Sequence, residues 1–455
     1  MRLITMLAAA LLLITSSATG IQQSAPDRPN VVLIMTDDAG YADTGSYGAP
    51  DIRTPNIDSL ARDGVKLTDF YANAMSCTPT RAGLIAGRYQ QRYGVEFVLA
   101  APGLPGSHGG LPPLTHSLPL LMKKNGYATA LVGKWHLGYT PEFSPRVHGF
   151  DLFFGYKSAA IDSYTHFTAR PSEGAQFISA QPDLWEDEAL IEQDGYMTDL
   201  ITRRSVEFIN RNATRPFFID VAFNAPHSPV QRPDDPGRAP TPGSATRADY
   251  AAMMERVDRG VGEILQTLRT RGLEQNTIVI FTNDNGGVGL SHSGPLFHRK
   301  FSAWEGGIRV PALIRWPGRI PAGTVSAQVG MTMDLTASIL VATATPVPSD
   351  ARLEGVNLFP ILERKAPQLE RILFWRTAGP SPVNMNQKAV RSGDWKLIID
   401  GAITRIFLFN VKADPGERQD LLARRPDIAQ RLQKLLTDWE RDVDAEAKVF
   451  AATRQ

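Results

Sequence analysis

Residues 30–40 read NVVLIMTDDAG, an unbroken apolar run that ends in two adjacent acids, an alanine and a glycine. A continuous apolar run without polar alternation is typical of a strand that is buried on both faces of a sheet. Three further runs share this form and its polar ending: ATALVGKWH at 128–136, FFIDVAFNAPH at 217–227 and TIVIFTNDNGG at 277–287. The sequence therefore predicts four buried strands, each followed by polar, loop-forming residues.

Helical patterns separate these strands. Segments 117–125, 196–210 and 248–271 carry apolar residues at helical spacing, and Gly126 and Gly272 follow two of them as stop signals. Strands that alternate with helices predict an α/β fold whose mostly parallel sheet has helices on both faces. Because ligands bind beyond the carboxyl ends of strands in such sheets, we expect the four polar endings to face one pocket.

The pattern changes after about residue 365. Short apolar runs at 372–375, 388–391, 395–399 and 406–409 follow one another with short connections, and a helical pattern carries apolar residues from Ile428 to Trp439. This order predicts an antiparallel sheet with a closing helix. We therefore expect a large catalytic domain over 27–364 and a smaller C-terminal subdomain over 365–455.

The composition excludes several classes of protein. Hydrophobic residues make up 43% and charged residues 21% of 455 residues, which excludes a disordered chain, a coiled coil and a multi-span membrane protein. Lys plus Arg number 48 and Asp plus Glu 47, so the net charge of +1 indicates neither a nucleic-acid partner nor a membrane surface.

The first twenty residues form a separate unit. Arg2 precedes an apolar run through Ile14 and then small residues, the order found in a secretory signal peptide. The run is too short for a membrane span, although an uncleaved N-terminal anchor is the alternative. We expect residues 1–20 to be a signal peptide, and the mature protein to be exported to the periplasm or secreted without stable membrane insertion.

The chain has a single cysteine, Cys77, which cannot form an internal disulfide. A small buried hydrophobe and a functional thiol are both open on the count alone. Residues 76–88 read SCTPTRAGLIAGR, and Pro79 suits the first turn of a helix. This places Cys77 at a helix N-terminus with Arg81 on the same face, a setting that by itself suggests an activated thiolate.

The segment CTPTR at 77–81, followed by AGLIAGR, resembles the signature of the type I sulfatases of the alkaline phosphatase superfamily. Further segments follow in the family's order over nearly all of residues 28–440. They are Asp37-Asp38, GKWHLG at 133–138, DNGG at 284–287, Lys300, EGGIRVP at 305–311, RWPG at 315–318, RSGDWK at 391–396 and DPGE at 414–417. The resemblance implies an alkaline phosphatase-like α/β fold and a formylglycine at position 77, formed from Cys77 by a maturation enzyme.

Oxygen ligands for a metal come from two strand ends. Asp37, Asp38 and Asp284 supply three carboxylates and Asn285 an amide oxygen, a set that suits a hard cation such as Ca²⁺ or Mg²⁺ rather than zinc. Any one of these acids alone could instead be a cap or turn residue. The resemblance implies Ca²⁺, with the hydrated aldehyde of Cys77 completing its coordination.

Two lysines and two histidines stand in the matching motifs. Lys134 and Lys300 are suitable fixed cations for sulfate oxygens, whereas a solvated surface charge is the alternative for each. His136 and His227 can transfer protons near neutrality. The resemblance implies that His136 and Arg81 act on the aldehyde diol, and that His227 and Lys300 face the sulfate and leaving group. The other histidines have no comparable motif and are expected to be structural or to face substrate: His108, His116, His148, His166, His292 and His298.

The predicted function is hydrolysis of an alcohol, aryl or carbohydrate sulfate, with a sulfated small molecule or glycan as partner. A phosphonate or phosphodiester hydrolase of the same superfamily is one alternative, and a catalytically silent protein that binds sulfated polysaccharide is another. Segments 100–110, 231–246 and 379–387 are rich in Gly, Pro and polar residues, and we expect them to shape the entrance to the pocket.

Overall fold

The computed structural model describes residues 28–100, 109–169, 181–236, 244–377 and 386–452. The predicted signal peptide, His108 and parts of the three predicted entrance segments lie outside the described residues. Within the described part of the chain, no helix combines the length and apolar character needed to cross a bilayer.

The four predicted strands form the centre of a large sheet. They are β1 (Asn30–Thr36), β4 (Ala128–Lys134), β8 (Phe217–Ala222) and β9 (Thr277–Asn283). All of their residues are buried, and β1 pairs in parallel with both β8 and β9, while β4 pairs in parallel with β8. The prediction of a mostly parallel core is confirmed.

Six shorter strands complete the large sheet, and the sequence analysis did not identify them. They are β2 (Val65–Leu67), β5 (Leu152–Tyr156), β6 (Trp185–Glu186), β7 (Ala189–Leu190), β10 (Ala312–Arg315) and β11 (Thr324–Ser326). The order of the ten strands is β11-β2-β10-β9-β1-β8-β4-β5-β6-β7. Because β10 runs antiparallel to β9 and β2, and β6 antiparallel to β5, the sheet is mixed.

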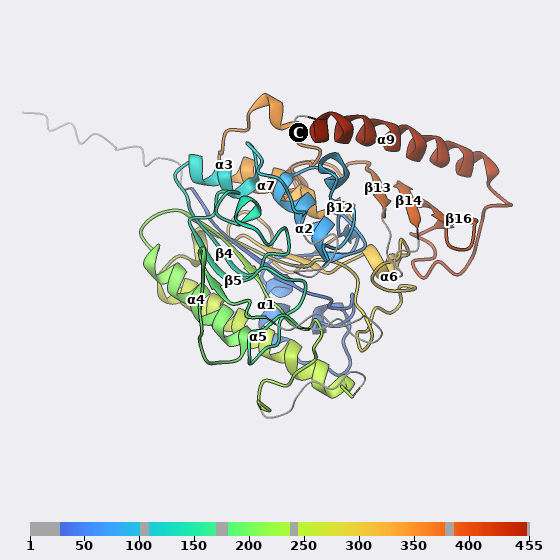
Figure 1. Cartoon of the computed structure of the whole chain (residues 1–455). Coiled ribbons are helices and arrows are strands. Elements are labelled where there is room, and N and C mark those ends of the chain that lie inside the picture. The colour runs from blue at the N-terminus through green and yellow to red at the C-terminus, as the bar shows by residue number, and fades with distance from the viewer. Residues whose placement is uncertain (1–27, 101–108, 170–180, 237–243, 378–385, 453–455) are drawn as a thin grey trace, which may run out of the picture.

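Helices cover both faces of this sheet (Figure 1). One face carries α2 (Cys77–Ala86), α3 (Leu118–Lys124) and α7 (Thr332–Ala342); the other carries α1 (Pro55–Arg62), α4 (Met197–Arg211) and α5 (Arg247–Thr270). Along β1, Leu33 packs into the first layer and Ile34 into the second, as the alternation of strand side chains requires. Each such fully buried side chain contributes about 1.5–3 kcal/mol.

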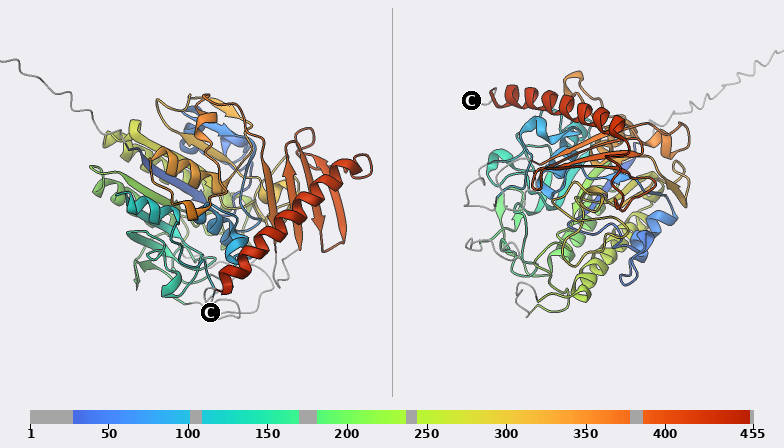
Figure 2. Two further views of the ribbon diagram at one scale, coloured as in Figure 1. Left: turned by 90° about the horizontal axis from the view of Figure 1, so that it is seen from above. Right: turned by 90° about the vertical axis from the view of Figure 1, so that its right-hand side faces the viewer.

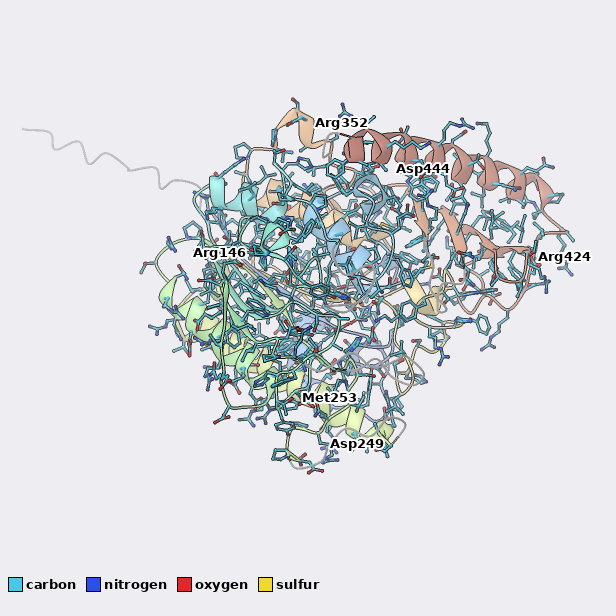
Figure 3. The ribbon with its side chains drawn as sticks, viewed as in Figure 1. Arg146, Asp249, Met253, Arg352, Arg424 and Asp444 are labelled. Carbon is cyan, nitrogen blue, oxygen red and sulfur yellow. The ribbon has the colours of Figure 1, made fainter. Side chains whose placement is uncertain are left out.

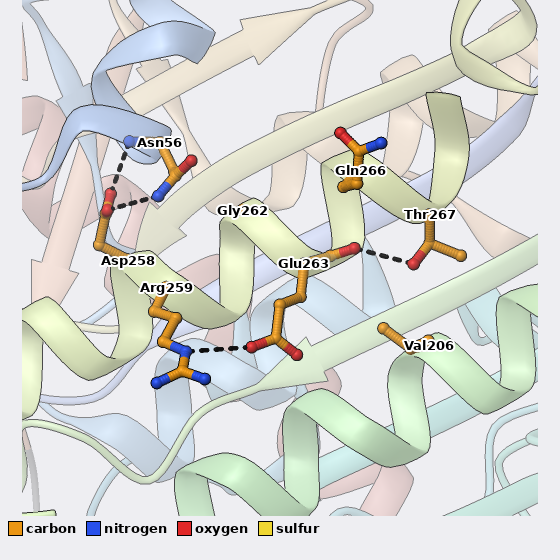
Figure 4. A pocket seen from close by; sticks show the side chains of 8 residues that line it. All are labelled: Asn56, Val206, Asp258, Arg259, Gly262, Glu263, Gln266 and Thr267. Atoms are coloured by element: carbon orange, nitrogen blue, oxygen red, sulfur yellow. Dashed lines mark hydrogen bonds and ion pairs between the residues drawn. The ribbon is translucent and has the colours of Figure 1, made fainter. Parts of the chain in front are cut away.

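A buried carboxylate joins α1 to α5 beside a surface pocket. Asp258 Oδ1 accepts hydrogen bonds from the backbone N–H groups of Asn56 (2.9 Å) and Ile57 (2.8 Å), so α5 caps the N-terminus of α1. Figure 4 shows this pocket, which is lined by Asn56, Val206, Asp258, Arg259, Gly262, Glu263, Gln266 and Thr267. None of the predicted site residues lines it, and the Asp258 contacts are explained by capping.

The C-terminal region forms the predicted antiparallel sheet. Its strands β13 (Ile372–Arg376), β14 (Gln387–Ser392), β15 (Trp395–Asp400) and β16 (Arg405–Asn410) pair in chain order, and α9 (Pro426–Ala452) crosses the sheet (Figure 2). The short helix α6 (Glu305–Ile308) lies between this small sheet and the rest of the protein (Figure 1). The remaining strands are β3 (Phe70–Tyr71) and β12 (Gly330–Met331), and the remaining α-helix is α8 (Phe359–Leu362).

The small sheet shares a core with the large part of the protein. Tyr71, Met75 and Trp304 pack in the same apolar cluster as the inner residues of the small sheet and α9. Ion pairs add to this contact: Arg92 meets Asp442 of α9 at 2.6 Å, and Arg376 of β13 meets Glu96 at 2.6 Å. Within the C-terminal region, Arg376 also meets Asp444 of α9 at 2.7 Å (Asp444 is labelled in Figure 3). The exact position of the domain boundary near residue 365 stays a prediction.

Candidate active site

The four polar strand ends meet at the carboxyl edge of the large sheet. Asp37 and Asp38 follow β1, Lys134 ends β4, His227 lies beyond β8, and the pair Asp284-Asn285 follows β9. Lys134 Nζ is 2.6 Å from Asp37 Oδ2, and His227 Nε2 is 3.5 Å from Asp38 Oδ2. Asn285 Nδ2 donates to Asp38 Oδ1 at 2.7 Å. The topology thus brings together side chains that lie more than 240 residues apart in sequence, as the interval between Asp38 and Asn285 shows.

Cys77 is the first residue of α2, and its side chain faces this edge. The preceding Ser76 is extended, the helix ends at the left-handed Gly87, and every residue of α2 is buried. Lys300 Nζ lies 3.9 Å from Cys77 Sγ. Burial raises the pKa of the Cys77 thiol despite the opposing charges of Lys134 and Lys300. The unmodified thiol is therefore not the activated thiolate that a helix start beside an arginine suggested.

The guanidinium of Arg81 contacts the carboxylate of Asp284. Its Nη2 and Nε donate to Asp284 Oδ2 at 2.9 and 3.2 Å, and its Nη1 donates to the carbonyl of Lys134 at 3.1 Å. Burial alone would lower the pKa of Arg81, but Asp284 and Asp37 raise it above its usual value. A fixed guanidinium thus joins the first turns of α2 to the strand ends of β4 and β9.

The acids of the site are buried close to one another. Burial would raise the pKa of Asp37, but Lys134, His227 and Arg81 together hold it well below its usual range. For Asp284, burial and the negative charge of Asp37 raise the pKa to about 7, against the opposing effect of Arg81. The ionised form of one acid therefore disfavours the ionised form of the other, a conflict that a bound cation would relieve.

The donor atoms at this edge fit a hard divalent cation. Asp37 Oδ1 and Asn285 Oδ1 are buried and have no hydrogen-bond partner among the described residues. Asp37, Asp38 and His227 each offer a ligand atom, and these three atoms lie within 4.8 Å of one another. Buried oxygens without partners are rare in folded proteins, and carboxylate and amide oxygens suit Ca²⁺ or Mg²⁺.

The two candidate histidines differ in their surroundings. His136 is fully buried at a positive φ of 55°, and neither of its ring nitrogens has a hydrogen-bond partner among the described residues. Burial lowers its pKa well below the usual value, and Lys134 and Arg81 add to this, so the ring is neutral. His227 Nδ1 lies 2.7 Å from the carbonyl of Ser228, which fixes the proton on Nδ1 and turns Nε2 towards Asp38.

Both candidate lysines are buried. The exposed fraction is 1% for Lys134 and 5% for Lys300, which excludes a solvated surface charge for either. Lys300 Nζ donates to Asp38 Oδ1 at 2.6 Å. Burial would lower the pKa of Lys300, but Asp38 and the neighbouring anions raise it above its usual value. Lys134 and Lys300 thus place two positive charges among the acids of the site.

Asp43 is a residue of this region that the sequence analysis missed. Its carboxylate accepts from the Gly40 N–H (2.7 Å), the Tyr250 hydroxyl (2.5 Å) and the His292 N–H (3.1 Å), and pairs with Arg247 (2.8 Å). It thereby joins the loop after Asp38 to the loop after Asn285 and to α5. The only sequence signal was an acid in the glycine-containing loop after β1, which does not show these distant donors.

The remaining described histidines show mainly structural contacts. His116 Nε2 lies 3.2 Å from the Tyr93 hydroxyl, and His148 and His166 each place Nε2 3.0 Å from a backbone carbonyl. His292 is the backbone donor to Asp43 described above. His298 lies two residues before Lys300 in a left-handed conformation.

Comparison with known proteins decides the family. The sequence model described as Sulfatase matches residues 29–345, well over half of the chain. The chain belongs to the sulfatase family. A second model, described as N-sulphoglucosamine sulphohydrolase, C-terminal, matches residues 294–442 of this sulfatase and overlaps the first. The family assignment confirms the resemblance seen in the sequence, including membership of the alkaline phosphatase superfamily.

Individual relatives match almost the whole sulfatase chain. It is 32% identical to N-acetylgalactosamine-6-sulfatase of Canis lupus familiaris over 93% of this chain and 90% of that protein. It is 33% identical to arylsulfatase A of Bos taurus over 90% and 86%. The crystal structure of Ps i-CgsB in complex with k-i-k-neocarrahexaose has a TM-score of 0.81 and 29% identity, and covers 90% of this chain and 92% of that chain. The protein is a sulfuric ester hydrolase.

Proposed function

We propose that this sulfatase cleaves alcohol, aryl or carbohydrate sulfates with a hydrated formylglycine, formed from Cys77, as the nucleophile. The observation that carries the proposal is the position of Cys77. It begins α2 at the edge where Asp37, Asp38 and Asp284 meet, with the Lys300 ammonium 3.9 Å from its Sγ. A thiol with a raised pKa is a poor nucleophile there, whereas a diol oxygen at the same place faces fixed positive charges.

The proposed metal is Ca²⁺, with Mg²⁺ as the alternative. Asp37, Asp38, Asp284 and Asn285 would hold it through their side-chain oxygens, together with the diol at position 77. When bound, the cation would supply a positive charge that favours ionisation of a hydroxyl beside it. The partnerless oxygens of Asp37 and Asn285 support this assignment.

The side chains divide the reaction between them. One hydroxyl of residue 77 would give its proton to a carboxylate of the site and attack sulfur, and the bond between sulfur and the alcohol oxygen would break with transfer of its electron pair to that oxygen. Lys134 and Lys300 would bind the sulfate oxygens, and His227, when its Nε2 is protonated as well as its Nδ1, would supply the proton that the leaving alcohol takes up. Arg81 would orient the diol through its fixed contact with Asp284.

Release of sulfate requires the second hydroxyl of residue 77. His136 is buried, neutral and without a hydrogen-bond partner among the described residues, so it can accept the proton of that hydroxyl. The electron pair of the former O–H bond then re-forms the carbonyl, and the bond to the sulfated oxygen breaks. The aldehyde is regenerated and inorganic sulfate leaves.

A peptide mass spectrum that covers position 77, taken on protein from its native host, tests the proposal. The aldehyde form is lighter than the thiol form, and we expect the aldehyde form in active protein. A preparation that turns over substrate while carrying only unmodified thiol would contradict the formylglycine proposal.

The charge of the pocket predicts a preference for sulfate. A sulfate ester brings one negative charge into this buried site and a phosphate monoester brings two, and the second charge is repelled more strongly by Asp37, Asp38 and Asp284 than the two lysines can offset. We therefore expect a higher kcat/KM for an aryl sulfate than for the matched aryl phosphate. A clear preference for phosphate would favour the alternative of a phosphonate or phosphodiester hydrolase.

A sulfated sugar is the proposed natural substrate class. The canine relative is named for a sulfated N-acetylgalactosamine, and Ps i-CgsB was crystallised with a neocarrahexaose. We propose that the chain is exported through residues 1–20 and that a maturation enzyme modifies Cys77. Sulfate release from sulfated oligosaccharides, measured by ion chromatography, tests the class. Binding without any release would favour the catalytically silent alternative.

A further inference from the structure

The segment that carries Lys300 has a strained backbone. His298 and Phe301, on either side of Lys300, have positive φ values of 68° and 69°. A left-handed conformation is unfavourable for a non-glycine residue, and it persists only where the surroundings fix it. The position of the Lys300 ammonium therefore depends on the contacts that hold this segment.

Two of these contacts come from the large part of the protein. The Lys300 N–H donates to the carbonyl of Gly287 at 3.1 Å, in the loop after β9. The Phe301 N–H donates to the carbonyl of Met75 at 2.8 Å, just before α2. These bonds join Lys300 to the loops that carry Asn285 and Cys77.

Two further contacts come from the C-terminal region. The Ala303 N–H donates to Gln387 Oε1 at 2.7 Å, and the Glu305 N–H donates to Glu417 Oε2 at 2.7 Å. Gln387 is the first residue of β14, so the small sheet contacts the chain only three residues after Lys300. Figure 1 shows α6, which begins at Glu305, on the side of the large part that faces β13 and β14.

The orientation of the Gln387 carboxamide is fixed. Its Nε2 donates to Asp400 Oδ2 at 2.6 Å, and because a carboxylate only accepts, this bond turns Oε1 towards Ala303. Gln387 is 1% exposed and Ala303 is fully buried, so water cannot replace this hydrogen bond. A buried N–H that loses its acceptor is destabilising, so the hydrogen bond to Gln387 helps to hold the strained backbone at His298 and Phe301.

We propose that Gln387 of the small sheet is a positioning residue that holds Lys300 against Asp38 and Cys77. The inference rests on the proposed role of Lys300 at the sulfate group. Since that role is to stabilise charge that develops in the transition state, displacement of Lys300 affects kcat more than KM. Gln387→Met keeps the length and burial of the side chain but has no strong acceptor, and we expect it to lower kcat about 10- to 100-fold with KM within about threefold.

Gln387→Glu separates positioning from stability. Glutamate keeps an acceptor for the Ala303 N–H, but it brings a second carboxyl group beside Asp400. We expect a lower melting temperature than for wild type, with kcat within about threefold of wild type. The two variants should thus share a lower melting temperature but differ in kcat, and an equal loss of kcat in both would overturn the proposal.

Gln328 provides a matched control. It is also 1% exposed, and its carboxamide makes hydrogen bonds with the N–H and carbonyl of Leu369 at 2.8 and 3.1 Å and with the carbonyl of Val329 at 2.9 Å. None of these contacts involves the segment that carries Lys300. Gln328→Met should lower the melting temperature as Gln387→Met does while leaving kcat unchanged. An equal loss of kcat in both would show a general effect of buried glutamines.

A crystal structure of Gln387→Met gives a readout that does not depend on turnover. We expect Lys300 Nζ to move more than about 1 Å from its place beside Asp38 Oδ1, where it lies at 2.6 Å in the wild type. An unmoved Lys300 would overturn the positioning role even if the formylglycine proposal holds. A displaced Lys300 in a chain whose Cys77 is never modified would instead leave the positioning role standing and overturn the proposed function.

Discussion

Two clusters of buried charged residues lie close together in this protein, and they differ in whether their polar atoms are paired. The site cluster consists of Asp37, Asp38, Arg81, Lys134, Asp284 and Lys300 at the edge of the large sheet. The interface cluster consists of Asp69, Glu305, Arg309, Arg391, Lys396 and Glu417, where α6 meets the small sheet. Both have acids and bases in equal number and little contact with solvent.

The interface cluster is closed. Glu305 receives the Tyr71 hydroxyl at 2.7 Å and pairs with Lys396 at 2.8 Å and Arg309 at 3.2 Å. Lys396 also contacts Glu417 at 2.9 Å, and Asp69 pairs with Arg391 and Arg309 at 2.9 and 3.1 Å. Each carboxylate oxygen of the cluster has an ion-pair or hydrogen-bond partner, and Glu417 Oε1, which makes no hydrogen bond among the described residues, still meets the Lys396 ammonium. The cluster thus serves the packing of the two sheets.

The site cluster is open, because Asp37 Oδ1 has no partner among the described residues, and neither do Asn285 Oδ1 and both ring nitrogens of His136 beside it. A protein leaves such atoms unpaired at a cost of about 1–3 kcal/mol each. Both clusters are charged and buried. The site cluster differs because it contains or adjoins buried oxygens that contact no cation or hydrogen-bond donor among the described residues and could therefore bind a ligand.

The largest expected effect is the loss of activity when the site cluster loses an acid. Asp37→Asn or Asp284→Ala should lower kcat/KM by about 1,000-fold or more, because each change removes the charge of a proposed metal ligand. The melting temperature of Asp37→Asn should change much less than its activity. Steady-state kinetics with an aryl sulfate, alongside thermal unfolding and metal analysis, measures both. Near-wild-type turnover by either variant would remove these acids from the mechanism.

Removal of the metal should have a similar effect without any mutation. Exhaustive chelation, with the loss of metal confirmed by elemental analysis, should abolish turnover, and Ca²⁺ should restore it. The reason is the conflict between the buried carboxylates of Asp37 and Asp284, which a cation relieves. Full turnover by metal-free protein would show that Asp37 Oδ1 and Asn285 Oδ1 do not bind a metal needed for the reaction.

A mutation in the interface cluster should lower the stability of the protein more than its activity. Lys396→Met leaves Glu305 and Glu417 facing each other without their shared cation, and we expect a loss of about 3–5 kcal/mol in the free energy of unfolding. Activity of the folded fraction at low temperature should stay within about tenfold of wild type. Denaturant unfolding and kinetics below the melting transition measure these quantities. A variant of normal stability that has lost all activity would make the interface cluster part of the chemistry.

Most of the site residues at the carboxyl edge of the large sheet could be predicted, because the strands that carry them have recognisable local sequence patterns. The apolar runs that end at Asp37, Lys134 and Asp284 are readable as buried strands, and a parallel sheet brings their carboxyl ends together. Two-residue strands such as β6 and β7 have too few positions to show a period, so they were missed.

Side-chain direction and distant pairing were not predictable. Arg81 was expected to act beside Cys77, but its bonds to Asp284 join residues 203 apart in sequence. The contact between Ala303 and Gln387 spans 84 residues and depends on how the small sheet packs. Neither residue type signals its partner, because glutamine and arginine make such bonds only when tertiary structure brings the acceptor or donor to them.

An isolated acid outside both clusters gives the smallest expected effect. Asp220 is buried in β8, its Oδ1 has no hydrogen-bond partner among the described residues, and burial raises its pKa to about 7 despite the opposing charge of Arg81. Between about pH 4 and 7 the folded protein keeps a proton that the unfolded chain has lost, so stability falls as pH rises through this window.

Asp220→Asn should remove this dependence. The variant should gain about 3 kcal/mol relative to wild type between pH 4 and pH 7, because the amide has no proton to lose. Thermal unfolding of both proteins across this range measures the difference. If the difference in stability between the two proteins stays constant across this pH range, the pKa of Asp220 is not raised in the folded protein.

The most direct test of the central claim uses Cys77→Ser, made in a host that cannot oxidise serine to the aldehyde. The serine hydroxyl can attack sulfur in the open site, but the sulfated serine lacks the second hydroxyl through which sulfate leaves. Intact-protein mass spectrometry after incubation with an aryl sulfate should show about one added sulfuryl group per chain, with a burst of product and no steady turnover. Sustained multiple turnover by this variant, with the serine confirmed, would contradict the account.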